Sequence, residues 1–166
     1  MASIVDPYEG FKSFKDAFRK KIIDPVLCEG HKDLYIFLDT ADNKPRLTYA
    51  IINEDIVKAF AVYASVEPID GIRCFGVGYA TDTEFRNQGL AQKVLKNSLI
   101  DVYKTFSNLL NSSKIYVEAI ISENNYISHK VASNILSKNF KKITDRLSGV
   151  PARKYELLMD KDTFVN

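Results

Sequence analysis

Apolar residues near the start of the chain recur three and four positions apart, at Phe11, Phe14, Phe18 and Ile22. This spacing places them on one face of an amphipathic helix. Asp6 and Pro7 before the stripe are typical of an N-cap and a first helical position, and Glu9 completes a capping-box pattern. Pro25 is expected to end this helix.

Four segments of strand-like composition follow, over residues 34–38, 46–52, 56–66 and 72–81. The connections are short and polar: residues 53–55 form one turn and residues 68–71 form another. Short turns between successive strands are typical of an antiparallel meander.

The second half of the chain returns to helical spacing. Residues 88–106 carry one apolar face, made by Ala91, Val94, Leu95, Leu99, Val102, Tyr103 and Phe106. Strand 114–121 follows, so strand, helix and strand predict a right-handed parallel crossover. A second helix over 125–138 has inward-facing Ile127, Val131, Ile135 and Leu136, and a last strand covers 154–159. The fold class is therefore α+β (mixed α/β), in one domain over residues 1–166.

Composition narrows the class of protein. A chain of 166 residues is long enough to bury its own core. Its 23 basic and 21 acidic side chains leave a net charge of +2, so no nucleic-acid partner is expected. Local basic clusters such as Lys138, Lys141 and Lys142 are interpreted as solvated surface. No segment reaches the roughly 18 to 20 apolar residues of a membrane span, and no signal-peptide core opens the chain. We expect a cytoplasmic protein without a membrane partner.

Cysteine and histidine give little sign of a metal or redox site. Cys28 and Cys74 make no disulfide framework and are expected to be buried, reduced thiols. His31 and His129 are too few and too scattered for a metal cluster, so no metal is expected. His129 is interpreted as an exposed helix residue.

The segment between the fourth strand and the long helix carries the clearest chemistry. A helix N-terminus presents backbone N–H groups without intrahelical partners and about half a positive charge. Gly89 lets a phosphate approach this backbone, and Arg86 adds a cation with a planar donor fork. The segment lacks the Gly-Lys-Ser/Thr ending of a Walker loop and two glycines of a dinucleotide fingerprint.

The run Arg86-Asn87-Gln88-Gly89-Leu90-Ala91 resembles the pyrophosphate loop of the GNAT acetyltransferase superfamily, Gln/Arg-x-x-Gly-x-Gly/Ala, in its expected place. A second match follows the fifth strand, where Asn125 and Ser128 form an Asn-x-x-Ser start. Asn139-Phe140 is similar to the Gly-Phe that closes the next helix. The resemblance covers about residues 46–159.

The resemblance implies acetyl-CoA as cosubstrate and an amine as acceptor. It assigns contacts with the pantetheine amides to the backbone of Thr81, Asp82 and Thr83. It assigns the pyrophosphate to the backbone amides of Asn87, Gln88, Gly89, Leu90 and Ala91, beside Arg86. Asn125 would bond the pantetheine arm, serve as a helix N-cap, or do both. Ser128 would contact the same arm or lie on the helix surface.

The implied reaction is direct attack of a neutral amine on the thioester, with a backbone N–H of the fourth strand stabilising the oxyanion. The sequence departs from the family at the acid, because the positions that carry a tyrosine in many relatives fall on Ala132 or Ile135. Tyr126 and Tyr155 are the substitutes, although packing or surface is the commoner role of such a tyrosine.

The base is also unassigned by the resemblance, because strand 72–81 carries no carboxylate. Glu67 and Glu118 are the nearest carboxylates in neighbouring strands. A charge in a central strand needs a reason. For Glu118 an ion pair with a lysine is the alternative to catalysis, and a water chain is an alternative base. Cys74 has no nearby histidine, so a covalent acyl-enzyme is not expected.

The leading hypothesis is an N-acetyltransferase acting on a primary amine of a small molecule, peptide or protein. A catalytically weak or inactive acetyl-CoA-binding module is the alternative, because the tyrosine and the strand carboxylate are missing. A third reading, acetylation of aminoacyl-tRNA, is disfavoured by the near-neutral charge. The segment from Ser148 to Arg153 would border an acceptor pocket or form a plain turn. A homodimer is expected by resemblance.

Overall fold

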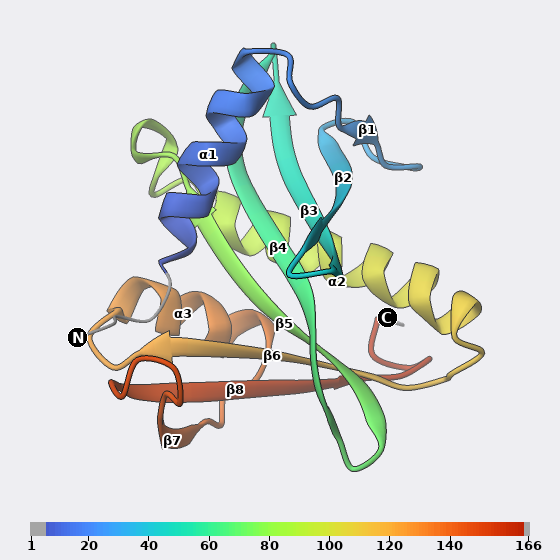
Figure 1. Ribbon diagram of the computed structural model, residues 1–166, viewed down its shortest axis with the longest axis vertical. Coiled ribbons are helices and arrows are strands. Elements are labelled where there is room, and N and C mark those ends of the chain that lie inside the picture. The colour runs from blue at the N-terminus through green and yellow to red at the C-terminus, as the bar shows by residue number, and fades with distance from the viewer. Residues whose placement is uncertain (1–5, 165–166) are drawn as a thin grey trace. The chain divides into compact units, whose positions relative to one another are not determined.

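The computed structural model describes residues 6–164, which form a mixed α/β fold with the strand order β1-β2-β3-β4-β5-β6-β8-β7 (Figure 1). The helices are α1 (Pro7–Arg19), α2 (Leu90–Leu109) and α3 (Tyr126–Ile135), with a 3₁₀ turn η1 (Thr83–Phe85). The strands are β1 (Val26–Leu27), β2 (Leu34–Ala41), β3 (Lys44–Asn53), β4 (Ile56–Ile69), β5 (Ile72–Thr81), β6 (Ile115–Ser122), β7 (Lys141–Thr144) and β8 (Pro151–Met159). The predicted fold class is confirmed.

The described chain divides into two compact units, and β4, β5 and α2 each contribute to both. The N-terminal unit comprises residues 6–64 and 78–98. The C-terminal unit comprises, among the described residues, 65–77 and 99–164.

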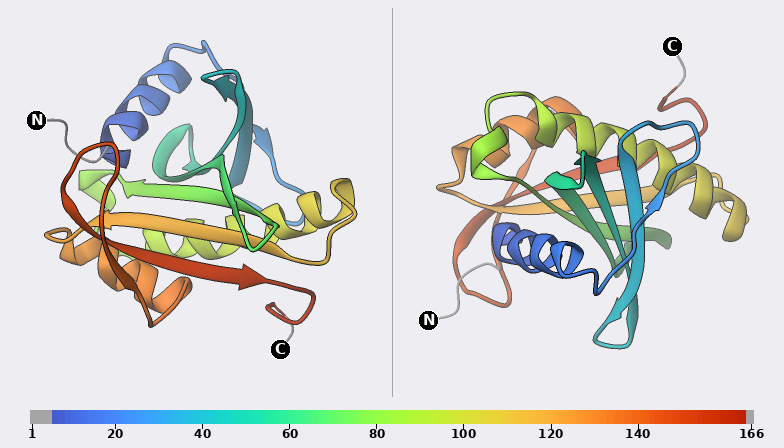
Figure 2. Two further views of the ribbon diagram at one scale, coloured as in Figure 1. Left: turned by 60° about the horizontal axis from the view of Figure 1, so that its bottom comes forward. Right: turned by 90° about the horizontal axis from the view of Figure 1, so that it is seen from above.

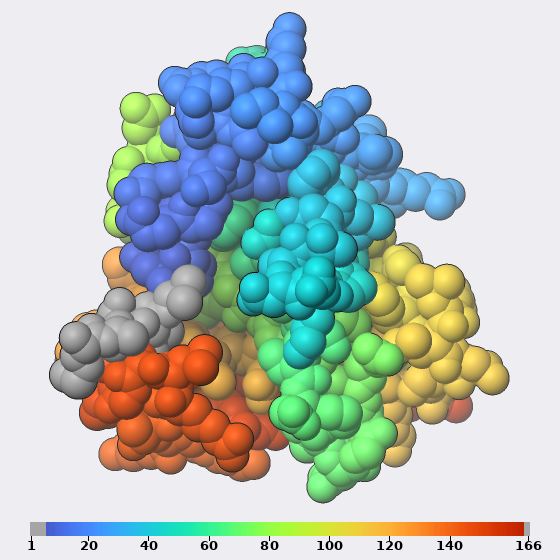
Figure 3. All heavy atoms as spheres, viewed as in Figure 1, coloured from blue at the N-terminus to red at the C-terminus, as the bar shows by residue number. Residues whose placement is uncertain are grey.

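In the N-terminal unit, α1 packs its apolar face onto β3 and β4 (Figures 1 and 2). Asp6 caps the helix by accepting a hydrogen bond from the amide of Tyr8, as the sequence predicts. The buried cluster beneath the helix consists of Phe11, Phe14, Ala50, Ile52, Val57 and Phe60. The other face of α1 meets solvent and is visible in blue in Figure 3. The helix also contacts the segment between β5 and α2, through Tyr8 and Lys15.

The expected end of the first helix is wrong. The helix ends at Arg19, because Lys21 adopts a left-handed backbone with φ of 56°. Ile22 therefore lies beyond the helix, 71% exposed, instead of extending the apolar stripe. Pro25 plays no part in ending the helix.

The predicted meander is confirmed by two-residue hairpin turns. Asp42 and Asn43 join β2 to β3, and Glu54 and Asp55 join β3 to β4, all at positive φ. Positive φ at both central residues is the geometry whose twist matches antiparallel strands. In the C-terminal unit β4 continues to Ile69, so the next turn is shorter than the four residues predicted.

The C-terminal unit contains the predicted crossover. β5 pairs with β6 in parallel, and β6 and β7 pair antiparallel with β8. Leu99 and Val102 of α2 are buried, as expected, and Phe106 packs on Phe75 with ring centroids 4.9 Å apart. The short strands β1 and β7 were not predicted, because two and four residues carry too little periodicity to detect.

Candidate functional site

The loop between β5 and α2 has an unusual backbone for so short a segment. β5 ends at Thr81, η1 follows, and α2 begins at Leu90. Asn87 and Gly89 both lie in the left-handed region, with φ of 63° and 72°. Left-handed residues within a turn aim successive N–H groups into a concave surface that suits an anion. A Cβ built on Gly89 would meet no atom within 4 Å, so the space in front of the loop is open.

The amides of this loop are available to a ligand. The first helical hydrogen bond of α2 runs from the amide of Lys93 to the carbonyl of Gly89, at 3.0 Å. Within residues 6–164, no protein oxygen accepts a hydrogen bond from the amides of residues 87–92. These groups also stand at the positive end of a 20-residue helix. The loop therefore combines N–H donors with a favourable field for a negative charge.

Arg86 lies beside these amides and is exposed. Its guanidinium lies over the ring of Tyr8, 5.4 Å from the ring centroid, and its Nε donates to the carbonyl of Thr81 at 3.5 Å. No carboxylate among the described residues forms an ion pair with it. Within the described residues, the cation thus lies next to the loop without a direct ion pair and in contact with α1.

Asp82 is the one buried acid of the segment. Its side chain is 4% exposed, pairs with Lys15 of α1 and accepts a hydrogen bond from the amide of Glu84 at 2.9 Å. Burial alone would raise the pKa of Asp82, but the hydrogen bonds from Lys15 and Glu84 and the charges of Lys15 and Arg86 lower it. Its carboxylate is occupied, so only its backbone is open to the predicted pantetheine contact. Thr81 is half-buried and Thr83 is exposed.

In the C-terminal unit, Asn125 is the N-cap of α3, and its Oδ1 accepts a hydrogen bond from the amide of Ser128 at 3.2 Å. This confirms the capping interpretation of Asn125. Ser128 is half-buried near the start of the helix. The pantetheine contacts of both residues stay predictions.

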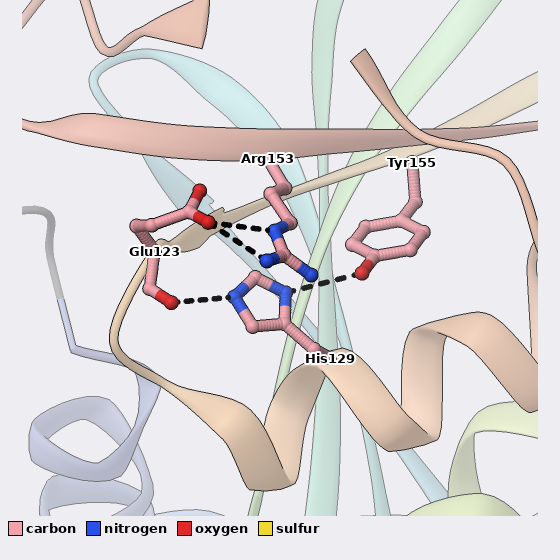
Figure 4. A network of polar contacts seen from close by, with 4 residues as sticks. All are labelled: Glu123, His129, Arg153 and Tyr155. Carbon is pink, nitrogen blue, oxygen red and sulfur yellow. Dashed lines mark hydrogen bonds and ion pairs between the residues drawn. The ribbon is translucent and has the colours of Figure 1, made fainter. Parts of the chain in front are cut away.

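A polar network lies behind this helix start (Figure 4). The Nε2 atom of His129 lies 3.2 Å from the carbonyl oxygen of Glu123, and the Nδ1 atom lies 3.1 Å from the hydroxyl of Tyr155. Arg153 donates two hydrogen bonds to Oε1 of Glu123, at 3.0 and 2.8 Å. His129 is only 6% exposed, so the expectation of an exposed helix residue is wrong.

The candidate acids and bases do not form one cluster. Glu118 forms an ion pair with Lys154 at 3.6 Å, the alternative that the sequence left open. Tyr126 is 74% exposed at the start of α3, and Glu67 is exposed near the end of β4. Among residues 6–164, no hydrogen bond or ion pair joins these three side chains. Their catalytic roles stay predictions.

Both cysteines are buried and unbridged, as expected. Burial raises the pKa of Cys74 to about 12. The charges of Glu118 and Glu156 add to this rise, and the charge of Lys154 opposes it. A thiol with so high a pKa carries almost no thiolate at neutral pH and is a poor nucleophile. No group of histidine, cysteine or acidic side chains in the described part of the chain has the arrangement of a metal site. In the same residues, no helix combines the length and the apolar character needed to cross a membrane.

Nothing in the sequence indicates the ion pair between Lys15 and Asp82 or the network around His129. Both join segments that are far apart along the chain, and polar partners of this kind leave no periodic signal. The only hint was positional: Asp82 directly follows a strand, and His129 closely follows a helix cap.

No protein-family model matches the sequence, and no curated protein matches it. Solved structures resemble it at the level of fold. RimL, a ribosomal L7/L12 alpha-N-protein acetyltransferase in complex with coenzyme A, is 16% identical with a TM-score of 0.50. The match covers 69% of this chain and 63% of the RimL chain. A ribosomal-protein-S5-alanine acetyltransferase from Vibrio fischeri is 15% identical with a TM-score of 0.50, and the match covers 70% of this chain and 63% of the Vibrio chain. The NatC complex bound to Gag peptide and CoA is 15% identical with a TM-score of 0.51, and the match covers 68% of this chain and 70% of the NatC chain.

The chain thus spans less than two thirds of the length of the first two of these proteins. At 15–16% identity, the likeness is one of fold. The fold is that of the acetyltransferases in these structures.

Proposed function

We propose that the chain is an acyl-CoA-dependent N-acyltransferase that transfers an acetyl group from acetyl-CoA to a primary amine. One observation supports it most strongly: the amides of residues 87–92, which donate to no protein oxygen within residues 6–164, open α2 in a fold like that of known acetyltransferases. This row of amides coincides with the Arg86-to-Ala91 motif, and the coincidence supports the proposal.

The loop would hold the diphosphate of the cosubstrate. The amides of residues 87–91 would donate hydrogen bonds to phosphate oxygens, and the dipole of α2 would favour the negative charge. Arg86 would add a charge-assisted contact after leaving the ring of Tyr8, with which it makes a cation–π contact, and the carbonyl of Thr81, to which it donates a hydrogen bond of 3.5 Å. The backbone of Thr81, Asp82 and Thr83 would pair with the pantetheine amides.

The transfer itself would be direct. The amine nitrogen attacks the thioester carbonyl and the C–S bond breaks. A base takes the proton that the amine loses, and an acid or water returns a proton to the departing thiolate, so that CoA leaves as a thiol. Cys74 takes no part, because its thiol is buried and protonated. Glu118, Glu67 and Tyr126 are the proposed candidates for proton transfer, together with water. Positioning alone can supply a large part of such an acceleration.

A direct test is the release of free CoA from acetyl-CoA in the presence of a panel of amines. Peptides with free N-termini belong in this panel beside small amines, because two of the similar structures are named for acetylation of ribosomal proteins. Amine-dependent release of CoA supports the proposal. Binding of acetyl-CoA without release for any amine favours the alternative, a binding module, which the apolar Ala132 and Ile135 at the tyrosine positions make a real competitor.

A further inference from the structure

Asp82 joins the end of β5 to the loop that opens α2. Its amide donates to the carbonyl of Lys58 at 2.9 Å, and its own carbonyl accepts from the amide of Phe85 at 3.0 Å. Its Oδ1 caps the η1 turn at the amide of Glu84, and its Oδ2 meets Nζ of Lys15. Every polar group of this residue is therefore used to hold the chain at the point where it leaves the strand.

Helix α1 supplies the partner. Lys15 is 45% exposed, whereas the carboxylate that it neutralises is 4% exposed. The same helix meets β5 and the loop at two further places. A Cβ on Gly78 would lie 3.0 Å from Cγ of Pro7, and Arg86 lies over Tyr8. The helix thus contacts the strand, the turn and the loop in succession.

The loop needs such support because its backbone is strained. Asn87 holds a left-handed conformation that a residue with a side chain adopts at some cost, and it persists only where the surroundings fix it. A buried carboxylate can provide this fixing only while it is paired, because an unpaired charge would draw water and open the site.

We propose that Lys15 and Asp82 are positioning residues for the coenzyme: their ion pair holds the η1 turn so that the amides of residues 87–91 face the diphosphate together. Neither side chain touches the ligand. The inference rests on the proposed function, and it adds α1 to the parts of the chain that determine coenzyme affinity.

The experiment measures the affinity for CoA by calorimetry, and the unfolding temperature without ligand, in four variants. Asp82→Asn keeps an oxygen for the amide of Glu84 but removes the charge, and Lys15→Met removes the partner. Lys15→Arg keeps the cation and serves as the conservative rescue. Lys20→Met is the matched control, because it removes the lysine at the C-cap of the same helix, which pairs with the half-exposed Asp16.

We expect Asp82→Asn and Lys15→Met to weaken CoA binding at least tenfold, about 1.4 kcal/mol. Lys15→Arg should restore most of this affinity, and Lys20→Met should bind as the unaltered protein does. In ligand-free Lys15→Met, the amide resonances of residues 87–91 should shift in nitrogen–proton NMR spectra, while Lys20→Met leaves them in place.

Two results would overturn the inference. Variants that melt earlier but bind CoA with unchanged affinity well below their melting temperature would reduce the ion pair to a purely structural role. If Asp82→Asn fails to fold, Lys15→Met decides, because its side chain is half exposed. If the unaltered protein binds no CoA, the proposed function and this inference are both refuted. If the unaltered protein and all four variants bind CoA with the same affinity, the inference alone is refuted.

Discussion

The hydroxyl of Tyr155 lies 3.1 Å from Nδ1 of His129, and this contact joins β8 to α3 inside the C-terminal unit. The other ring nitrogen faces the carbonyl of Glu123 at 3.2 Å. A carbonyl oxygen only accepts, so Nε2 must carry a proton, and in the neutral ring Nδ1 accepts from the tyrosine hydroxyl. The tautomer is thus assigned by its two partners.

Removing this hydroxyl should destabilise the fold. Tyr155→Phe leaves a buried nitrogen without its donor, so we expect a loss of about 1–3 kcal/mol in the free energy of unfolding. Urea titration monitored by circular dichroism measures it. Tyr126→Phe is the matched control, because that hydroxyl belongs to a side chain that is 74% exposed, and it should change stability little. Equal stability of both variants would show that the contact contributes nothing.

Gly89→Val should weaken the binding of acetyl-CoA at least tenfold. The backbone is left-handed there, with φ of 72°, and the new side chain would project into the open space in front of the amides. Calorimetric titration measures the effect. Gly149→Val is the matched control, because that glycine has a φ of 70° and equally open surroundings but lies in the β7–β8 loop. Undiminished binding in Gly89→Val would count against the placement of the diphosphate.

Arg86→Ala should lower the affinity for CoA about fivefold, with the larger effect at low salt. The side chain is exposed and forms no ion pair with a carboxylate of residues 6–164, so its contribution to anion binding should be screened by added ions. Titrations at two salt concentrations check both points. The exposed Arg146 in the loop before β8 provides the control, Arg146→Ala. A fall in affinity that is identical at both salt concentrations would contradict the electrostatic explanation.

Cys74 should react slowly with alkylating reagents. Ionisation of its thiol should also lower the free energy of unfolding at alkaline pH. Burial raises its pKa to about 12, from an ordinary value of 9.0. The folded state therefore holds the proton more tightly, and its advantage is complete below pH 9 and is lost as the pH rises toward 12. Unfolding measured across this range should show a steeper decline in the unaltered protein than in Cys74→Ala.

Iodoacetamide at pH 8 supplies a second readout. In a Cys28→Ser background, the remaining thiol should react much more slowly in the native protein than in urea. Rapid native alkylation would contradict the protonated, buried state.

The sequence predicts most of this fold because the burial of one face leaves a periodic record. Phe11 and Phe14 repeat at helical spacing, and Val94, Leu95, Leu99 and Val102 do the same in α2, and all of them are buried. Asn125 caps a helix and Gly89 takes a positive φ, as local chemistry dictates. The position of Ile22 is not predicted correctly from local propensity. The helix ends just before Lys21, whose left-handed backbone cannot be predicted from the residue type.

The supports of the candidate site escape prediction for a different reason. The carboxylate of Asp82 and the imidazole of His129 are buried because partners arrive from α1 and β8, and neither partner can be inferred from the neighbouring residues. The same holds for Glu118, whose ion pair with Lys154 depends on the register between β6 and β8. Polar pairs between distant segments are properties of the assembled fold.

Backbone NMR during a CoA titration shows whether the amides that open α2 bind the diphosphate of CoA. We expect the amide signals of residues 87–92 to shift most and to saturate together, and we expect Gly89→Val to abolish these shifts at the same CoA concentration. Saturable binding of CoA that leaves these signals in place, with the largest shifts elsewhere in the chain, would contradict this expectation.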